Sequence, residues 1–348
     1  MLERHLYEHF RIHLEKTMHL GNDLIIDGNG KKYLLRQGSL LNDKRILEQK
    51  RMAEYLTYQQ ERDVVIPILS STGKAISVVD GQEVIICELP SDQLREPSFQ
   101  EEKSIARRLA QFHIRGEYFE QHLSQGTWYS WRQRWIKRLD QLENWYVKIQ
   151  HERYKRKMDE LFLLSFPYFL GLTENAIQMM TDLLINDPFA IRDERGNTIC
   201  HYRFHEGCWL TLDEHQVAKY KVPADFYYDH FTRDLAEYVR HIGAGDLSFR
   251  RKIKRTENFL SRYQTVRPLE MKDIHLLMAR LVFPVHYLDQ IEKYYRTVDE
   301  EVKAGIEDEL TTLYSQTEEY ETFIHSISTF FPASLSNPVI PKWVAKEI

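Results

Sequence analysis

The distribution of secondary-structure signals along the chain limits its fold more than any other feature of the sequence. Short apolar and β-branched runs bounded by turn dipeptides are concentrated before residue 89. After it, long stretches rich in Leu, Tyr and Trp repeat their apolar side chains at helical spacing. Strands that come first and helices that follow predict the α+β class. Because 348 residues exceed a typical single domain, we expect two lobes.

The expected elements define three parts of the chain. We interpret residues 1–89 as a strand-rich N-terminal lobe, 90–330 as a helical C-terminal lobe and 331–348 as an extended tail. Asn42 is placed to cap the central helix of the first part. The elements predicted there are a helix (2–13), two strands (24–27 and 32–37), a helix (43–58) and three strands (64–69, 75–80 and 84–88). The helices predicted after it cover 101–114, 128–154, 159–170, 174–185, 229–242, 252–263, 271–281, 289–295 and 302–324.

Composition and charge exclude several classes of protein. The 47 basic and 52 acidic residues give a net charge of −5, and no basic patch predicts nucleic-acid binding. Cys87, Cys200 and Cys208 form no CxxC pair, which favours reduced thiols in an intracellular compartment. The charged N-terminus lacks the apolar core of a signal peptide, and no apolar run approaches the ~20 residues of a membrane span. We therefore expect a soluble protein made in the cytoplasm.

Residues 199–210 (Ile-Cys-His-Tyr-Arg-Phe-His-Glu-Gly-Cys-Trp-Leu) carry the most informative motif. They resemble the catalytic loop of aminoglycoside-phosphotransferase-type small-molecule kinases, apolar-Cys-His-Gly-Asp-x-His-x-Gly-Asn-apolar. His201, His205 and Gly207 keep the spacing of that loop. The resemblance therefore implies a two-lobed, protein-kinase-like fold.

The two residues that perform chemistry in such a loop are replaced. Arg203 stands where the catalytic Asp is expected, and Cys208 stands where the metal-binding Asn is expected. Phosphoryl transfer uses a carboxylate to accept the substrate proton and oxygen ligands to hold Mg²⁺. A guanidinium offers only donors with a pKa above ~12, and a thiol is a poor ligand for a hard cation. Conventional catalysis at this loop is therefore not expected.

The chain as a whole resembles the spore coat protein family of Bacillus-type endospore formers (the CotS/YutH group), which shares the aminoglycoside phosphotransferase fold. Four other segments carry the resemblance: Leu-Ala-x-Phe-His at the end of 106–113, a small turn at 126–128, Arg-Asp-Leu-Ala at 233–236 and Leu-x-Phe-Pro at 281–284. It implies synthesis in the mother-cell cytoplasm, assembly into the spore coat and other spore coat proteins as partners.

The nucleotide-binding residues implied by the resemblance are altered as well. The lysine that clamps the α- and β-phosphates is replaced by Arg36, which keeps the charge on a bulkier, forked group. Its partner on the following helix is expected to be Glu48 or Glu54. A solvated helix face explains these two glutamates equally well.

The metal-binding positions give a similar result. The second metal-binding Asp is expected close to Val222, which cannot ligate Mg²⁺. Asp225 can take its place only if the loop has shifted. Asp234, in the family, fixes the catalytic loop by hydrogen bonds. Four alterations in the catalytic set together point to a degenerate kinase.

Two further interpretations of the loop rest on its sulfur and imidazole groups. Cys200, His201, His205 and Cys208 are residue types that bind zinc, but their spacing fits no common set. Cys208 with His205 offers a nucleophile and a base, but no third group orients them. Both interpretations are disfavoured.

The leading hypothesis is a catalytically inactive, kinase-like component of the spore coat that needs no cofactor. The alternative is an active kinase that binds ATP and Mg²⁺ through Arg36 and through Asp225 or Asp229, with Glu206 as its base. A nucleotide sensor without turnover, which holds phosphates with Arg36 and Arg203, is the third possibility. The sequence leaves the oligomeric state open.

Overall fold

The computed structural model describes residues 2–21, 23–37, 42–90, 104–119, 128–188, 194–210 and 220–331. The chain divides into two compact units, Met1–Gln125 with Asn197–Asp234 and Gly126–Gly196 with Leu235–Ile348. Residue 89, the predicted lobe boundary, lies inside the first unit. Most of the predicted tail lies outside the described residues. No helix in the described ranges is both long and apolar enough to cross a membrane.

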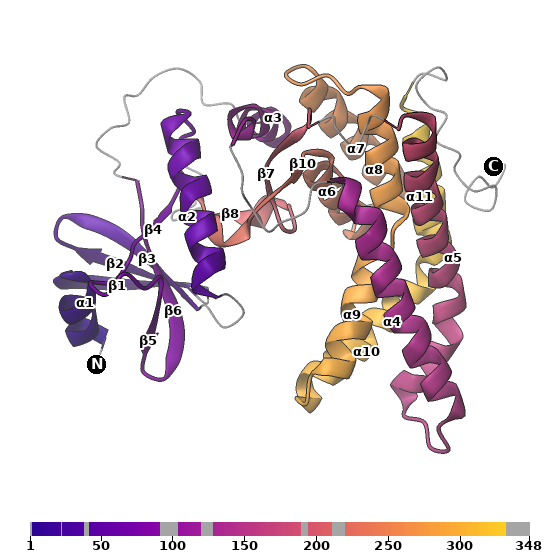
Figure 1. Ribbon diagram of the computed structural model, residues 1–348, viewed down its shortest axis with the longest axis horizontal. Coiled ribbons are helices and arrows are strands. Elements are labelled where there is room, and N and C mark those ends of the chain that lie inside the picture. Colours follow the sequence, from indigo (N-terminus) through magenta and orange to yellow (C-terminus); the bar gives the residue numbers. More distant parts are fainter. Residues whose placement is uncertain are drawn as a thin grey trace. The chain divides into compact units, whose positions relative to one another are not determined.

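In its described residues the first unit combines strands with helices (Figure 1). In chain order its elements are α1 (Leu2–Phe10), β1 (Leu14–Leu20), β2 (Asp23–Gly28), β3 (Lys31–Gln37), α2 (Asp43–Tyr58), β4 (Ile66–Pro67), β5 (Ile76–Val79), β6 (Gln82–Glu88), α3 (Ile105–Gly116), β7 (Asn197–His201), the 3₁₀ turn η4 (Glu206–Cys208), β8 (Trp209–Leu210), β9 (Tyr220–Lys221), the 3₁₀ turn η5 (Pro223–Asp225) and β10 (Phe226–His230).

The N-terminal sheet buries both of its faces. Its antiparallel strand order is β1-β2-β3-β6-β4, and β5 also pairs with β6. Neighbouring residues along a strand point to opposite faces. One face packs with Ile46 of α2 through Ile25, Leu34 and Ile85. The other packs with Leu6 of α1 through Ile26, Tyr33 and Ile86. This double burial explains the continuous apolar runs of β2, β3 and β6.

Local signals located most of these elements, but strands β1 and β10 were missed. The helix predicted at 229–242 begins at Thr232, because residues 226–230 form β10. Helix α2 begins and ends where the sequence predicted, and the Asn42 side chain accepts a hydrogen bond from the Arg45 N–H at 2.9 Å. The predicted hairpin of β2 and β3 is present. Strand β1 was missed because its side chains are mostly exposed and show no alternation. The first helix ends at Phe10, three residues earlier than predicted.

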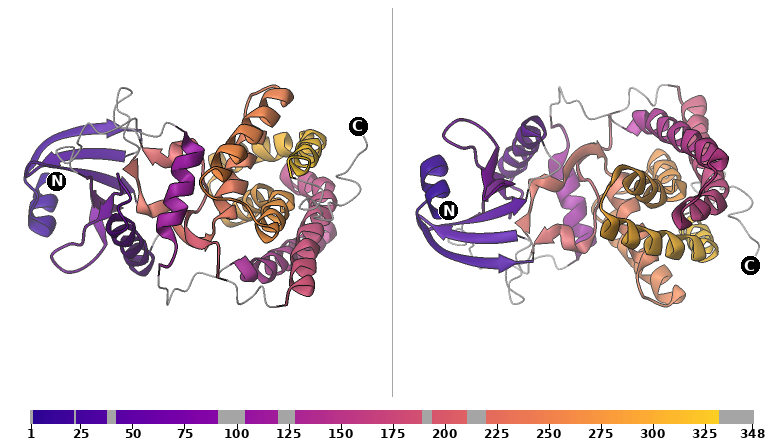
Figure 2. Two further views of the ribbon diagram at one scale, coloured as in Figure 1. Left: turned by 90° about the horizontal axis from the view of Figure 1, so that it is seen from above. Right: turned by 90° about the horizontal axis from the view of Figure 1, so that it is seen from below.

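The second unit is helical in its described residues (Figure 2). Its elements are η2 (Trp128–Ser130), α4 (Trp131–His151), α5 (Lys157–Asn186), α6 (Thr232–Ala244), which begins in the first unit, α7 (Phe249–Gln264), α8 (Met271–Val282), α9 (Val285–Arg296), α10 (Glu300–Ser315) and α11 (Thr317–Ser328).

Two helix predictions in this unit were wrong. The helices predicted at 159–170 and 174–185 are one continuous helix, α5, which contains Pro167 and Gly171. The helix predicted at 302–324 is two helices that meet at Gln316. In α5 the helix continues through Gly171, so the low helix propensity of glycine did not end it.

Candidate functional site

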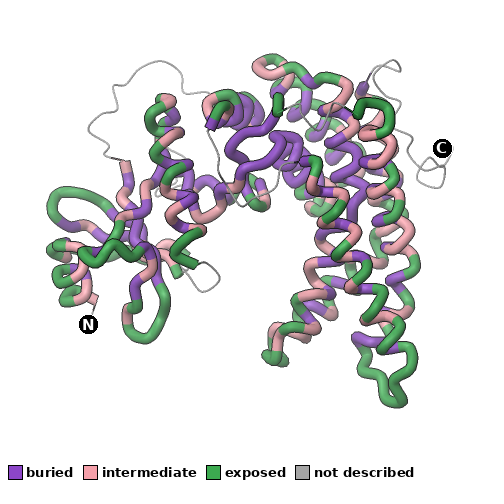
Figure 3. Tube along the Cα trace, viewed as in Figure 1, coloured by how far each residue is buried: buried purple, intermediate pink, exposed green. Residues whose placement is uncertain are grey.

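The loop at 202–208 starts from a fully buried strand. Every residue of β7 is buried, and β7 pairs antiparallel with β10 so that His201 lies opposite Phe226. Figure 3 shows that β7 and most of β10 are buried, and Tyr227 of β10 is half-buried. After the loop, β8 pairs with β9, with Trp209 opposite Lys221. The loop is therefore anchored at both ends in paired strands of the first unit.

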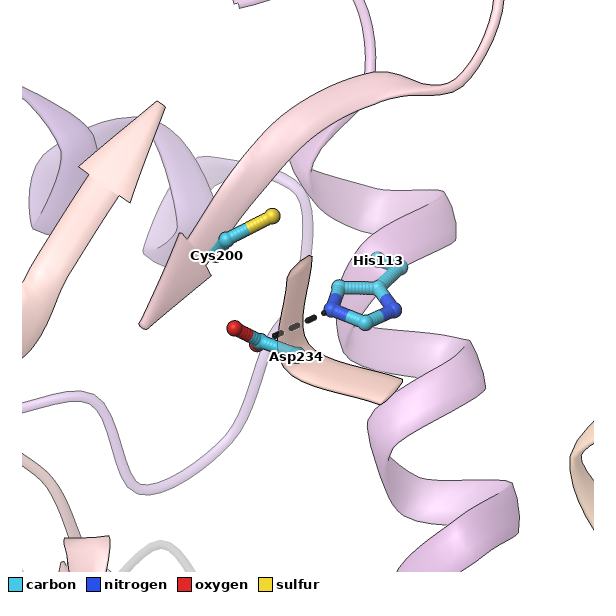
Figure 4. Close-up of side chains that lie close together, drawn as sticks. All are labelled: His113, Cys200 and Asp234. Atoms are coloured by element: carbon cyan, nitrogen blue, oxygen red, sulfur yellow. Dashed lines mark hydrogen bonds and ion pairs between the residues drawn. The ribbon is translucent and has the colours of Figure 1, made fainter. Parts of the chain in front are cut away.

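The Asp234 carboxylate holds the start of the loop. Its Oδ1 accepts a hydrogen bond from the backbone N–H of His201 at 2.9 Å. Its Oδ2 lies 2.7 Å from Nδ1 of His201. The same oxygen lies 3.1 Å from Nε2 of His113, a contact that Figure 4 marks with a dashed line. All three residues are buried. Asp234 thus joins the end of α3, the end of β7 and the start of α6 in one network.

The His201 imidazole has a defined tautomer. The Trp209 Nε1–H donates to Nε2 of His201 at 3.0 Å, and an indole can only donate. The imidazole Nε2 is therefore the acceptor, so Nδ1 carries the proton and donates it to Asp234. The rings of Phe112 and Phe204 lie 4.8 Å from the imidazole. His201 is consequently a structural group of the loop, with both of its ring nitrogens bonded inside the protein.

The pKa of Asp234 reflects these contacts. Burial raises it, but the interactions with His201 and the hydrogen bond from His113 outweigh burial and lower the pKa to about 2. The carboxylate is therefore ionised at neutral pH. An ionised carboxylate with several N–H donors is a strong hydrogen-bond acceptor, which suits a fixed structural role.

Arg233 fixes the next part of the loop. Its guanidinium donates to the carbonyl oxygens of His201 at 3.2 Å and Tyr202 at 3.1 Å. It also donates to Oδ2 of Asp229 at 3.0 Å, and Oδ1 of Asp229 accepts from the backbone N–H of His230 at 2.9 Å. Both oxygens of Asp229 are engaged inside the protein. This arrangement disfavours Asp229 as a metal ligand.

The sulfur of Cys208 is bound within the loop. Its thiol donates to the carbonyl oxygen of Arg203 at 2.9 Å, and the His205 N–H donates to Sγ at 3.4 Å. Burial is the main cause that raises the pKa of Cys208, to about 12. Cys208 is thus protonated at neutral pH, whereas a nucleophile or zinc ligand must be a thiolate.

We expect Cys208 to resist alkylation in the folded protein. With a pKa of about 12 its thiolate fraction at pH 8 is about a thousandfold smaller than that of free cysteine. Iodoacetamide labelling followed by peptide mass spectrometry measures the rate. Unfolding in urea provides the control and should restore rapid labelling. Labelling of the native Cys208 as fast as free cysteine would contradict this assignment.

Three buried groups lie close enough to suggest a metal site. Ligand atoms of His113, Cys200 and Asp234 lie within 4.8 Å of one another (Figure 4), and no other such group occurs in the described ranges. Hydrogen bonds explain the cluster: Asp234 accepts from His113, and the Cys200 thiol donates to the Asp229 carbonyl at 3.4 Å. The zinc set considered from the sequence shares only Cys200 with this cluster.

Arg36 forms a charge cluster at the end of β3. Its guanidinium makes a two-pronged contact with Asp23, at 2.8 to 3.1 Å, and lies 3.6 Å from the Asp225 carboxylate. Among the described residues these aspartates, and not Glu48 or Glu54, are its ion-pair partners. The charge expected to bind phosphate is therefore already balanced by two carboxylates.

The other predicted positions lie as follows. Val222 is buried in the apolar cluster with Tyr220, so it lines the core. His205 and Gly207 are exposed, and Nδ1 of His205 accepts from the Gly207 N–H at 3.1 Å. Glu206 is exposed at the start of η4. The sequence did not predict that Asp23 pairs with Arg36, that His113 pairs with Asp234 or that Trp209 pairs with His201, because only the fold brings these residues together. His113 was noted only as the last residue of a family motif.

Comparison with solved structures places this fold among the kinase-like phosphotransferases. An aminoglycoside phosphotransferase from Alicyclobacillus acidocaldarius matches with a TM-score of 0.59 at 15% identity, over 91% of this chain and 92% of that one. An AMP-bound spectinomycin phosphotransferase, APH(9)-Ia, matches with a TM-score of 0.56 at 14% identity, over 97% and 96%. The chain therefore has the two-lobed α+β fold of the aminoglycoside phosphotransferases, as predicted.

Sequence comparison gives the family. The family described as "Spore coat putative kinase YutH" matches residues 3–327, and the chain belongs to it. The endospore coat-associated protein YutH of Bacillus subtilis (strain 168) is 31% identical over 322 residues, which cover 90% of this chain and 89% of that protein. The predicted family is confirmed.

Proposed function

We propose that this protein is a catalytically inactive member of its family that acts as a structural and interaction component of the endospore coat. The name of its Bacillus subtilis relative supports the location. On this proposal the protein is made in the mother-cell cytoplasm, assembles into the coat and binds other coat proteins. Because the fold alone does not determine function, the proposal that the protein is inactive rests on the residues of the loop at 202–208.

One observation carries the proposal of inactivity. The position that needs a proton acceptor carries the guanidinium of Arg203, and the position that needs an oxygen ligand carries Cys208, whose thiol is bonded back to the Arg203 carbonyl. Neither group can accept the substrate proton or hold Mg²⁺. The loop keeps its backbone support through Asp234 while lacking the chemistry.

The kinase alternative has less support from the same geometry. It uses Arg36 on the phosphates and Asp225 on the metal, but these two groups lie 3.6 Å apart and Arg36 is also held by Asp23. ATP and Mg²⁺ would have to break these ion pairs before binding. We therefore propose that neither is a cofactor of this protein.

We expect no phosphoryl transfer from ATP with Mg²⁺ or Mn²⁺. Small-molecule and protein kinases turn over at about 1–100 s⁻¹, and we expect a rate at least about a thousandfold below that range. Release of [³²P]phosphate and transfer to added protein measure it. An Asp225→Asn variant is the control, because turnover that it retains comes from a contaminant. Turnover abolished by Asp225→Asn would overturn the proposal.

The coat location is tested separately in sporulating cells. A fluorescent fusion expressed from its own promoter should appear during sporulation and concentrate around the forespore. Cross-linking of purified spores should then join the protein to other coat proteins. A uniform signal in vegetative cells would contradict the proposed location.

A further inference from the structure

Helices α4, α5, α9 and α10, which Figure 1 labels, surround a pocket of about 390 Å³ in the second unit. This volume lies within the ~300–1,000 Å³ of small-molecule sites. Aromatic and charged side chains line the pocket together, and all of its lining residues belong to the second unit. The pocket is therefore large enough for a small molecule and offers it both apolar and charged contacts.

One wall of the pocket is aromatic and held in place from behind. The ring centroids of Trp145 and Tyr295 lie 5.4 Å apart. The Tyr295 hydroxyl donates to Oδ1 of Asp159 at 2.8 Å, and Oδ2 of Asp159 accepts from the backbone N–H of Arg156 at 2.8 Å. Both oxygens of this buried carboxylate are engaged, so Asp159 supports the wall. A wall that is ordered before binding lowers the entropic cost of holding an apolar group.

Two charged side chains at the pocket are available to a ligand. Lys148 and Glu152 are exposed and lie one helical turn apart at the end of α4. This spacing permits an ion pair, yet neither side chain makes an ion pair or a hydrogen bond with any described residue. Lys303, by contrast, is bound to Glu300 at 2.8 Å. The pocket therefore presents one accessible cation and one accessible anion side by side.

We propose that this pocket binds a free α-amino acid with an apolar side chain. An amino acid carries a carboxylate and an ammonium on a single carbon, which matches a cation and an anion one turn apart on a helix. Lys148 donates to the carboxylate, and Glu152 accepts from the ammonium. The apolar side chain packs against Trp145 and Ile149, because ligand pockets gain most of their affinity from buried apolar contact.

Such binding goes beyond the proposed coat function, because it requires neither a coat partner nor a particular location. It is also separate from the degenerate loop. The residues at 202–208 belong to the first unit, whereas every residue that lines this pocket belongs to the second. The sequence gave Lys148 and Glu152 no role, since an exposed charge on a helix is ordinarily only solvated.

Titration of the purified full chain with L-phenylalanine tests the site, with calorimetry and thermal unfolding as readouts. N-acetyl-L-phenylalanine lacks the ammonium, and L-phenylalanine amide lacks the carboxylate. We expect saturable binding of L-phenylalanine and roughly fivefold weaker binding of either blocked form, the effect of one accessible ion pair. Lys148→Gln should weaken L-phenylalanine and its N-acetyl form and leave the amide unchanged. Glu152→Gln should weaken L-phenylalanine and the amide and leave the N-acetyl form unchanged.

A matched control and the unliganded proteins separate binding from folding. Lys137→Gln removes an exposed lysine from α4 outside the pocket and should bind as the wild type does. Without ligand, Lys148→Gln and Glu152→Gln should melt as the wild type does, because both side chains are exposed. No saturable binding of L-phenylalanine up to about 20 mM, well above the ~1 mM Kd of a weak ligand, would overturn the proposal. Equal binding of the N-acetyl form would overturn it as well, because the site would then recognise a carboxylate alone.

Discussion

Asp234→Asn is expected to lower the free energy of unfolding by about 3–5 kcal/mol, the range seen when one partner of a buried charged network is removed. The side chain is fully buried and accepts hydrogen bonds from the His201 backbone, the His201 ring and the His113 ring. An asparagine keeps the shape but replaces one oxygen with an N–H₂ group, which faces donors rather than acceptors. Buried donors are then left without partners, at about 1–3 kcal/mol each.

Urea unfolding followed by far-UV circular dichroism measures this loss. Asp80→Asn is the matched control: Asp80 is exposed in the turn between β5 and β6 at φ 50°, a conformation that asparagine tolerates. We expect the control to stay within about 0.5 kcal/mol of the wild type, as surface substitutions usually do. Equal effects of the two substitutions would show that Asp234 does not hold the loop.

The pKa of Asp234 predicts how the difference in stability between the wild type and Asp234→Asn depends on pH. The pKa of Asp234 is lowered to about 2 in the folded protein, against ~3.9 for an unperturbed Asp. A depressed pKa gives stability that is complete above the unfolded value and is lost as the pH falls through the folded value. The gap between the wild type and Asp234→Asn should therefore shrink between about pH 4 and pH 2. A gap that is constant over this range would contradict the assignment.

Elements with strong local signals were predictable from the sequence. The Asn42 cap and the turn at Asn29-Gly30 act over a few residues, so their effect is visible in a short segment. The continuous apolar runs of the inner strands also follow from local pattern. Edge strand β1 and the single long helix α5 were missed, because pairing and packing with distant segments decide them.

The residues of the candidate site also fall into those whose chemistry the sequence reveals and those whose partners only the fold determines. The residue types at positions 203 and 208 can be judged from the sequence, since a guanidinium or a thiol has the same chemistry in any fold. Partners cannot be assigned in this way. His113 lies 121 residues before Asp234, and Arg36 pairs with Asp23 on the adjacent strand rather than with α2. The family resemblance gave Asp234 a loop-fixing role, and the hydrogen bonds from His201 are those that such a role requires.

The close approach of α3 to β7 decides whether His113 can reach Asp234, and it depends on Gly116. A Cβ added there would lie 2.5 Å from Oγ1 of Thr198 and 2.9 Å from the backbone nitrogen of Ile199. The Thr198 hydroxyl itself donates to the carbonyl oxygen of His113 at 2.6 Å. Part of the obstacle is backbone inside a buried strand, so it cannot move aside as a flexible side chain could.

Gly116→Ala is therefore expected to lower the free energy of unfolding by about 3 kcal/mol, at the upper end of the usual cost of overpacking. Gly171→Ala is the matched control on α5, because no atom lies within 4 Å of the added Cβ. Alanine favours the helix there, so we expect this variant to gain about 0.5–1 kcal/mol. Urea unfolding of both variants should thus give changes of opposite sign for the same chemical substitution. If Gly116→Ala were neutral, the contact of α3 with β7 could not be what positions His113.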